Sequence, residues 1–498
     1  MYCSEKPDIN RNSESNHASL HKKALRGGAW VFAEKGIEQI FNIGRLLILA
    51  RLLSPQDFGV IGIAFMLLNI LGRLSQIGFQ HALIQKKGRI EHYLDSAWTI
   101  LIIRGFIVCA ILYIFAPMFA GFFNETRAKP VIQVMGIGFL LGSVKNIGVV
   151  FFKRDLQFHK QFIFRFSGLV TDFMVALILA IIFRNVWALV FGFIAGNLVM
   201  SIISYYLNDY RPCPTMNLSK GKDLFLFGRW ILLTQVFDFL IIRGDHVFVG
   251  KVLGATALGF YLMAYRLSTL PATEIYNIIS QVLFPTYSKL QDDIPRLGEA
   301  FLKVIKISAF FVFPMSALIF ILSPDFVRLI LKEKWMPMVP AMQILVFWGL
   351  FRALSPGPIF QSVGKPAIHT WIQILRVLAL SILIYPLSIK YGIRGTAWAV
   401  FIQALVTYPI SMFLAFRILR FRVGEFVKIM IIPLIGSGLL TAGVYGLENY
   451  AFRSVNLPSL IFLAIIGVFI YSAFTMVLAK KFNYDIISML KRQYRAFL

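Results

Sequence analysis

Residues 458–479, PSLIFLAIIGVFIYSAFTMVLA, carry no charged side chain and are long enough to cross a lipid bilayer as one helix. Thirteen more apolar stretches of similar length precede them. Lipid offers the backbone no hydrogen-bonding partner, so a segment of this length crosses a membrane as a helix. The sequence therefore predicts an all-α polytopic membrane protein with about fourteen transmembrane helices, at residues 27–50, 58–83, 96–119, 131–152, 161–183, 186–207, 225–249, 257–284, 299–322, 338–361, 367–388, 395–416, 427–447 and 458–479.

The composition restricts the protein to functions within or beside the bilayer. Hydrophobic residues make up 58% of the 498 residues, and charged residues only 15%, well below the roughly 25% of soluble domains. The longest connections, residues 208–224 and 285–298, are too short for a folded domain. The polar first 25 residues lack the pattern of a cleavable signal peptide. We expect no cofactor and no metal, because Cys3, Cys109 and Cys213 are far apart and lack metal-site spacing.

The net charge of +26 is explained by membrane topology rather than by nucleic-acid binding. With the N-terminus inside, the cytoplasmic segments hold more than twice as many Lys and Arg residues as the outer loops. Positive residues favour the cytoplasmic side and the anionic lipid headgroups there. We therefore expect both termini to be cytoplasmic. Trp335 and Trp371, near the ends of predicted spans, are expected in the interfacial belt.

The two halves of the chain resemble each other. A shift of 200 residues aligns Gly28, Trp30, Gly44, Leu53 and Gly59 with Gly228, Trp230, Gly244, Leu253 and Gly259, and it aligns Glu38 with Asp238. Six spans separate the equivalents, so the repeat is parallel, and such repeats place a substrate site at their interface. The alternative, chance similarity between apolar helices, fits the single register of these matches less well. The expected domains are a cytoplasmic N-terminal tail (1–25), an N-lobe (26–207), a cytoplasmic linker (208–224), a C-lobe (225–416), two further helices (417–480) and a cytoplasmic tail (481–498).

Charged residues within the predicted spans indicate a polar interior, because a charge at the centre of a bilayer costs at least about 2.5 kcal/mol. Basic residues outnumber acidic ones there. Arg45, Arg165, Arg229 and Arg243 lie toward helix ends, where their side chains could instead reach the headgroups or form structural pairs. Arg73, Arg104, Arg266, Arg352 and Arg376 lie deeper, which favours a cavity or an internal pair. Glu38 and Asp238 are candidates for ion coupling, or equally partners of a nearby Arg, and His246 is expected to be a local hydrogen-bonding group.

Several motifs resemble a known family. They are RLLSPQDFG at 51–59, VLGATALGFYLMAYRLSTLP at 252–271, VLFPTYSKLQDD at 282–293 and SVGKP at 362–366. Together they are similar to the polysaccharide transporter family of the MOP superfamily, the Wzx-type flippases. This resemblance implies two six-helix lobes in the bacterial inner membrane and a cationic central cavity. On the implied lining helices, the basic positions are Lys35, Arg45, Arg73, Arg229, Arg243 and Arg266.

The resemblance also implies a substrate. It predicts a flippase that moves undecaprenyl-diphosphate-linked oligosaccharide units for O-antigen, exopolysaccharide or capsule synthesis, with the polysaccharide polymerase and chain-length machinery as further partners. The alternatives are a cation-coupled multidrug exporter of the same superfamily and a membrane polysaccharide polymerase or glycosyltransferase. The exporter would need a cavity dominated by acids. The enzyme would need larger loops or a catalytic motif that this sequence lacks, so we expect that the chain is not an enzyme.

Overall fold

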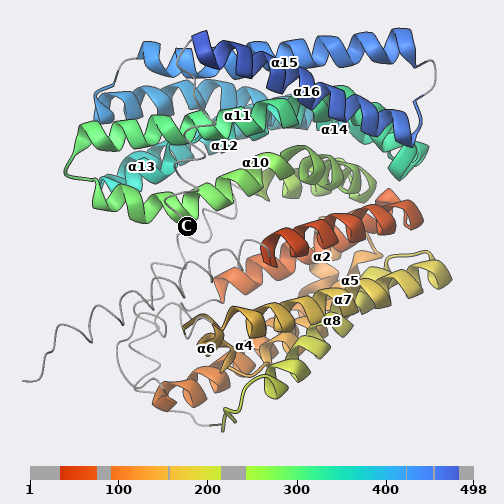
Figure 1. The fold of residues 1–498 in the computed structure, drawn as a ribbon. Coiled ribbons are helices and arrows are strands. Elements are labelled where there is room, and N and C mark those ends of the chain that lie inside the picture. Colours follow the sequence, from red (N-terminus) through yellow and green to blue (C-terminus); the bar gives the residue numbers. More distant parts are fainter. Residues whose placement is uncertain are drawn as a thin grey trace, which may run out of the picture.

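The computed structural model describes residues 34–75, 91–154, 157–214, 243–421, 423–452 and 455–481. All regular secondary structure in these ranges is helical, in agreement with the predicted all-α class. The helices form two bundles, one above the other in Figure 1, with α2 and α10 facing each other at the boundary. We call residues 34–214 the N-bundle and residues 243–481 the C-bundle.

The N-bundle contains the first seven described helices of the chain, one of which is short. They are residues 34–52, α2 (Pro55–Leu74), α4 (Glu91–Phe122), α5 (Ala128–Ser143), α6 (Val149–Arg154), α7 (Phe158–Phe183) and α8 (Trp187–Tyr206). The start of α2 follows from its sequence: Ser54 and Asp57 form a capping box around Pro55, which needs no N–H at the first helical turn.

The C-bundle begins with residues 243–252. It continues with α10 (Ala255–Lys289), α11 (Ile294–Phe326), η1 (Val327–Leu331), η2 (Glu333–Met338), α12 (Val339–Ala353), α13 (Gly357–Ser362), α14 (Pro366–Leu419), α15 (Val423–Ala451) and α16 (Leu457–Lys481). The expected N-terminal tail lies outside the described residues, as do most of the linker and most of the C-terminal tail. The domain limits therefore stay predictions.

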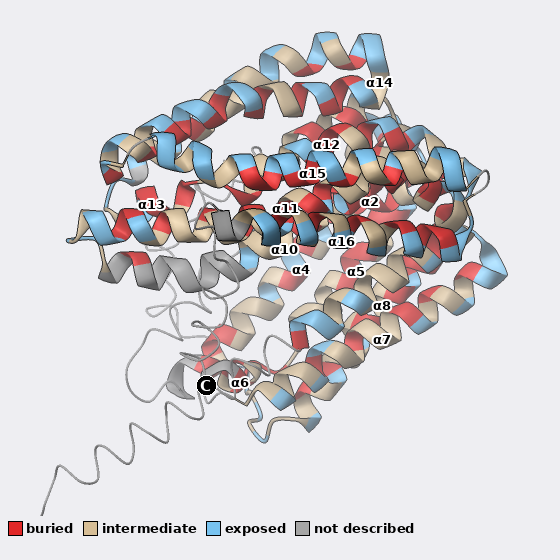
Figure 2. Cartoon of the chain, turned by 45° about the horizontal axis from the view of Figure 1, so that its top comes forward, coloured by how far each residue is buried: buried red, intermediate tan, exposed pale blue. Residues whose placement is uncertain are grey.

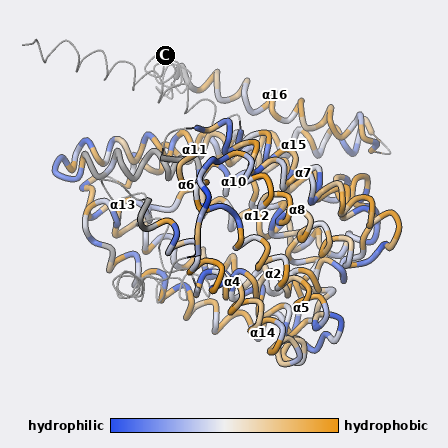
Figure 3. Tube along the Cα trace, turned by 90° about the horizontal axis from the view of Figure 1, so that it is seen from below, coloured by the Kyte–Doolittle hydropathy of each residue, from blue (hydrophilic) through white to orange (hydrophobic). Residues whose placement is uncertain are grey.

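The surfaces of both bundles are apolar, as a lipid environment requires. Large hydrophobic side chains such as Ile114 of the N-bundle and Phe469 of the C-bundle are 66% and 70% exposed. In Figure 2, exposed residues run along α14, α15 and α16, and Figure 3 shows that these helices are largely hydrophobic. Within the described residues, nine helices are long and apolar enough to cross a membrane. The chain is thus a multi-pass membrane protein, and the count of fourteen spans stays a prediction.

Two predicted spans differ in detail from the structure. The span expected at 131–152 is interrupted between α5, which ends at Ser143, and α6. Asn146 stabilises this break: its side-chain oxygen accepts from Gly148 N at 2.8 Å and its amide donates to Tyr210 O at 2.6 Å. The spans at 367–388 and 395–416 are joined in α14 by a reversal at Gly392, which has a φ of 59°. Ser388 and Thr396 hydroxyls lie 2.7 Å apart there, whereas eight residues rise about 12 Å in a straight helix.

The bundles meet where α2 crosses α10, and the crossing is reciprocal. A side chain at Gly59 would collide with the carbonyl oxygen of Ala255, and a side chain at Gly259 would collide with that of Pro55. The two contacts are equivalent under the sequence repeat, because Gly59 and Gly259 are 200 residues apart, as are Pro55 and Ala255. The parallel repeat is therefore visible as a near two-fold contact, and two glycines allow the backbones to approach this closely.

A second contact joins the bundles at the same end. The Trp335 indole, which is fully buried, donates from Nε1 to Ala50 O at 2.8 Å. Lys334 Nζ donates to Arg51 O at 2.9 Å and to Leu53 O at 2.6 Å. These C-bundle side chains thus satisfy carbonyls that the end of helix 34–52 leaves unpaired. The expectation of an interfacial Trp335 was wrong because its N–H is needed here; Trp371, 70% exposed, keeps a position compatible with a belt.

We predict that G59A and G259A each destabilise the protein by about 1–3 kcal/mol, because the added methyl group must push two backbones apart. Thermal unfolding of the purified protein in detergent would measure the loss as a lower Tm. Gly44→Ala is the matched control, since a Cβ there meets no atom within 4 Å. A Tm for G59A and G259A as high as that of the control would contradict the close crossing.

Candidate functional site

The face of α10 that contacts α2 continues into a charged stretch. Gly259 and Leu262 contact α2, and Arg266 follows Leu262 by four residues on the same helix face. Arg266 is exposed, although residues 263–265 and 267–269 around it are buried. The two helices therefore separate beyond their crossing, and Arg266 faces solvent at the boundary between the bundles.

The matching face of α2 shows the same change. Gly62 contacts Leu262, whereas Asn69 and Arg73, seven and eleven residues further along, are exposed. These spacings keep all three residues on one side of the helix. The boundary is thus closed at the crossing and accessible to water farther along, with a basic side chain on each wall.

Three predicted site residues come together at this boundary. The guanidinium of Arg266 is close enough to those of Arg45 and Arg243 to be repelled by both, and Glu274 is the acid that attracts it. Arg243 is exposed and Arg45 is half-buried. Cations from helix 34–52, helix 243–252 and α10 therefore converge from both bundles on one region.

Arg45 also has a structural partner. Its NH2 group lies 2.8 Å from Asp172 of α7, and the two side chains are 21% and 18% exposed. This pair anchors helix 34–52 to α7, next to edge-to-face contacts of Phe41 with Phe166 and Phe173. Asp172 thus neutralises one charge of the cluster, in agreement with the alternative that Arg45 forms a structural pair.

The start of helix 34–52 carries a separate group of charges. Lys35 is exposed, whereas Glu34 is buried and lies within electrostatic reach of Glu38, Lys35 and Arg165. Within the described part of the chain, Glu38 Oε1 is buried without a hydrogen-bond partner. The charges of Lys35, Glu38 and Arg165 therefore all act on Glu34, and the role of Glu38 in ion coupling stays a proposal.

The other predicted residues have different fates. Arg229 and Asp238 lie outside the described residues. Arg104 has a structural contact, because it donates to Gly72 O at 2.6 Å and to Ser75 Oγ at 2.7 Å. Both acceptors belong to the C-terminal end of α2, where helix carbonyls lack partners. Arg104 thus holds α4 to the end of α2.

A buried polar network lies beside the cation cluster. Asp245 accepts from His246 Nδ1 and from the Tyr261 hydroxyl, each at 2.8 Å, and from the His246 backbone N–H at 2.9 Å. His246 and Tyr261 are fully buried. His246 is therefore a hydrogen-bonding group, as expected, and the sequence analysis did not connect it with Tyr261. The sequence feature that could have indicated this network is the polar pair Asp245–His246 inside an apolar span.

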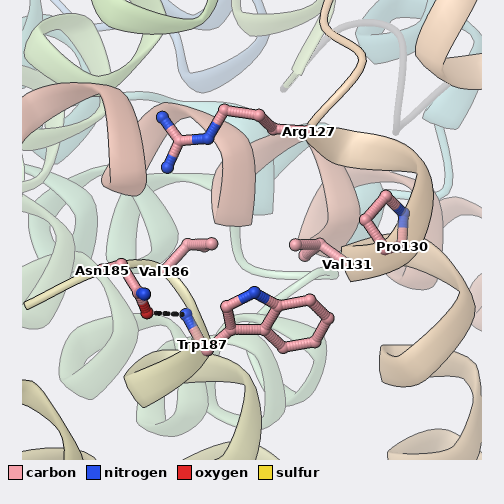
Figure 4. Close-up of a pocket in the computed structure, with 6 residues that line it drawn as sticks. All are labelled: Arg127, Pro130, Val131, Asn185, Val186 and Trp187. Carbon is pink, nitrogen blue, oxygen red and sulfur yellow. Dashed lines mark hydrogen bonds between the residues drawn. The ribbon is translucent and has the colours of Figure 1, made fainter. Parts of the chain in front are cut away.

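A pocket also lies away from this boundary, at the ends of α5 and α8 (Figure 4). Arg127, Pro130, Val131, Asn185, Val186 and Trp187 line it. Arg127 is 2.7 Å from Asp57, so its charge is largely neutralised. The pocket shares no residue with the predicted site, and its single cation is already paired.

The model of the family described as "Polysaccharide biosynthesis protein" matches residues 48–340, which is more than half of the chain. The chain belongs to this family. Its relatives include the lipopolysaccharide biosynthesis protein WzxC of Escherichia coli (strain K12), 23% identical over 68% of this chain and 69% of that protein. The teichuronic acid biosynthesis protein TuaB of Bacillus subtilis (strain 168) is 22% identical over 86% of this chain and 90% of that protein. The predicted family resemblance is confirmed.

Solved structures support the fold. An inward closed conformation of the lipid II flippase MurJ matches with a TM-score of 0.72, over 90% of this chain and 98% of that chain, at 15% identity. An inward-facing MATE-family multidrug transporter of the MOP superfamily matches with a TM-score of 0.61, over 76% and 94%, at 16% identity. This chain thus shares the helical fold of these two membrane proteins. Among the relatives, the succinoglycan biosynthesis transport protein ExoT of Rhizobium meliloti (strain 1021) is named as a transport protein, in agreement with the expectation that the chain is not an enzyme.

We predict that D245N lowers the free energy of unfolding by about 1–3 kcal/mol, because the buried donors of His246 and Tyr261 lose a charged acceptor. Thermal or denaturant unfolding in detergent would measure the change. D209N is the control, since Asp209 is exposed. Equal stability of both variants would show that the network does not hold helix 243–252 to α10.

Proposed function

We propose that this protein is a flippase that moves undecaprenyl-diphosphate-linked oligosaccharide units across the bacterial inner membrane for surface polysaccharide synthesis. The observation that carries the proposal is the convergence of Arg45, Arg243 and Arg266 at a water-accessible boundary between two repeated bundles. Of these three, only Arg45 forms an ion pair with a carboxylate of the described residues. The cluster therefore has positive charge available for an anion.

The diphosphate is the part of such a substrate that the cluster fits. Guanidinium groups bind phosphate oxygens through paired, charge-assisted hydrogen bonds. A diphosphate held there would be shielded from hydrocarbon together with the first sugars, while the lipid tail stays in the bilayer. Family membership and the relatives' names, which refer to lipopolysaccharide and teichuronic acid biosynthesis, support a substrate of this class.

The crossing of α2 and α10 suggests how the site changes sides. In this structure the bundles are in contact at Gly59 and Gly259, and Arg73 and Arg266 are exposed farther along the same two helices. With the N-terminus in the cytoplasm, the crossing lies toward the outer side and the cluster opens inward. Rocking of one bundle against the other about the repeat axis would reverse this. The topology, the inner-membrane location and the polymerase and chain-length partners belong to this proposal.

Ion coupling is a further part of the proposal. Glu38 is a candidate to bind a proton or sodium ion because a buried carboxylate oxygen without a partner gains most from one. Asp238, its equivalent in the repeat, completes the candidate pair.

A multidrug exporter is less well supported. The MATE-family structure shares the fold, but with a lower TM-score and over less of this chain than MurJ. A cavity for cationic drugs would need an excess of acids, whereas the described boundary carries an excess of arginines. A drug-resistance assay in a sensitive host separates the two functions.

We predict that R243Q and R266Q each reduce surface polysaccharide at least tenfold when they replace the native protein, because the diphosphate loses charge-assisted hydrogen bonds. Lipid-linked oligosaccharide should accumulate in the inner leaflet, where mass spectrometry of extracted lipids detects it. Arg296→Gln is the matched control, since Arg296 forms an exposed ion pair of little energetic importance with Asp293. Normal polysaccharide in both test variants, at normal protein abundance, would refute the proposed role of the cluster.

A further inference from the structure

A second group of basic and aromatic side chains lies in the C-bundle, where α12 packs against α10 and α14. We call it the C-bundle cluster; it consists of Tyr276 of α10, Trp348 and Arg352 of α12, and Gln373 and Arg376 of α14. All five side chains are half-buried. They therefore lie within the protein but keep some access to solvent.

The orientation of α14 turns Arg376 away from lipid. Trp371, Ile374 and Leu378, at helical spacing, are 70%, 40% and 55% exposed and form the outward face. Arg376 follows the buried Ile372 by four residues, so it lies on the opposite, inward face. Its NH1 group donates to Gln373 Oε1 at 3.1 Å, which orients both side chains.

The contact between α10 and α12 forms an aromatic surface next to it. Gly349 allows the close approach, because a Cβ there would lie 3.3 Å from the Cβ of Ala272. Beside this contact, the Trp348 ring lies 5.2 Å from the ring of Tyr265, and the Arg352 guanidinium stands 5.6 Å from the Trp348 ring centre. A planar cation and an indole are thus held side by side on one helix.

The two arginines are not neutralised. Tyr276 lies within electrostatic reach of Arg352 and Arg376, and the two arginines repel each other. No carboxylate of the described residues forms an ion pair with either of them. Two like charges inside a membrane protein are costly when unpaired, so an anion that enters this region would relieve their repulsion.

We propose that the C-bundle cluster is a subsite for an acidic sugar, one that carries a carboxylate, within the transported oligosaccharide. This inference rests on the proposed function and extends it to the glycan. Arg352 and Arg376 would bind the carboxylate, and the Gln373 amide would hydrogen-bond hydroxyl groups. The Tyr276 ring would cover the apolar C–H face of the sugar ring, and Trp348 would hold the Arg352 guanidinium in place. The diphosphate would occupy the separate cluster of Arg45, Arg243 and Arg266.

The same chemistry could bind the diphosphate itself, and the structure favours the sugar. A diphosphate needs cations alone, whereas this cluster combines two cations with two aromatic rings and an amide. Arg266 and Arg243 are exposed at the bundle boundary, whereas Arg352 and Arg376 are half-buried within the C-bundle. The arrangement is therefore that of two neighbouring anion sites with different lining.

The test measures binding of two anions to the purified full-length protein by isothermal titration calorimetry. The probes are trigalacturonate, inorganic pyrophosphate and, as a neutral sugar, maltotriose. For R352Q/R376Q we expect at least about tenfold weaker trigalacturonate binding and pyrophosphate binding within about twofold, because charge-assisted hydrogen bonds are lost at one site only. For R266Q we expect at least about tenfold weaker pyrophosphate binding and trigalacturonate binding within about twofold. Arg394→Gln, an exposed arginine on the same helix, should change neither.

Several results would overturn the proposal. Trigalacturonate binding that is absent in the unaltered protein or equal to that of maltotriose would exclude an acid-selective subsite. Equal loss of both anions in R352Q/R376Q would assign the arginines to the diphosphate. If that variant does not fold, Trp348→Leu replaces it, and it should weaken trigalacturonate about twofold to tenfold; no change would refute the aromatic role. If the unaltered protein does not bind pyrophosphate, that result instead counts against the proposed flippase function.

Discussion

Hydrocarbon cannot solvate charge, and this constraint determines where the arginines of this chain lie. Each guanidinium in a span must find an acceptor, an acid or water. Arg104 donates to the carbonyl of Gly72, Arg45 pairs with Asp172, and Arg266 is exposed at the boundary between the bundles. The same requirement that organises the interior thus leaves a basic, wetted surface where the two repeats meet.

The crossing of α2 and α10 makes that surface possible. Gly59 and Gly259 bring the two helices to backbone contact at one end, and Trp335 and Lys334 strengthen the contact by capping helix 34–52. Because helices that touch at one end diverge beyond it, Arg73 and Arg266 are left exposed on the continuing faces. The closed contact at one end of the boundary and the exposed arginines farther along it therefore both follow from the crossing of α2 and α10.

Much of this architecture could be predicted from local sequence. Apolar length predicts the spans, and the 200-residue register that aligns Gly59 with Gly259 predicts the parallel repeat to which the reciprocal crossing belongs. Contacts between distant residues could not be predicted in this way. Trp335 bonds to Ala50, and Arg45 to Asp172, and neither partner has a signature in its own segment. Likewise, the position of Arg376 opposite the lipid face becomes clear only when the exposure of its helix neighbours is known.

The central claim is that a basic boundary between the bundles carries a diphosphate-linked glycan across the membrane. Reconstitution into liposomes with a fluorescent undecaprenyl-diphosphate oligosaccharide tests it most directly, with a membrane-impermeant reductant to quench the outer leaflet. We predict that the protein makes nearly all of the fluorescence accessible and that a phosphate-free lipid of equal size stays protected. Equal movement of both lipids, or of neither, would contradict the account.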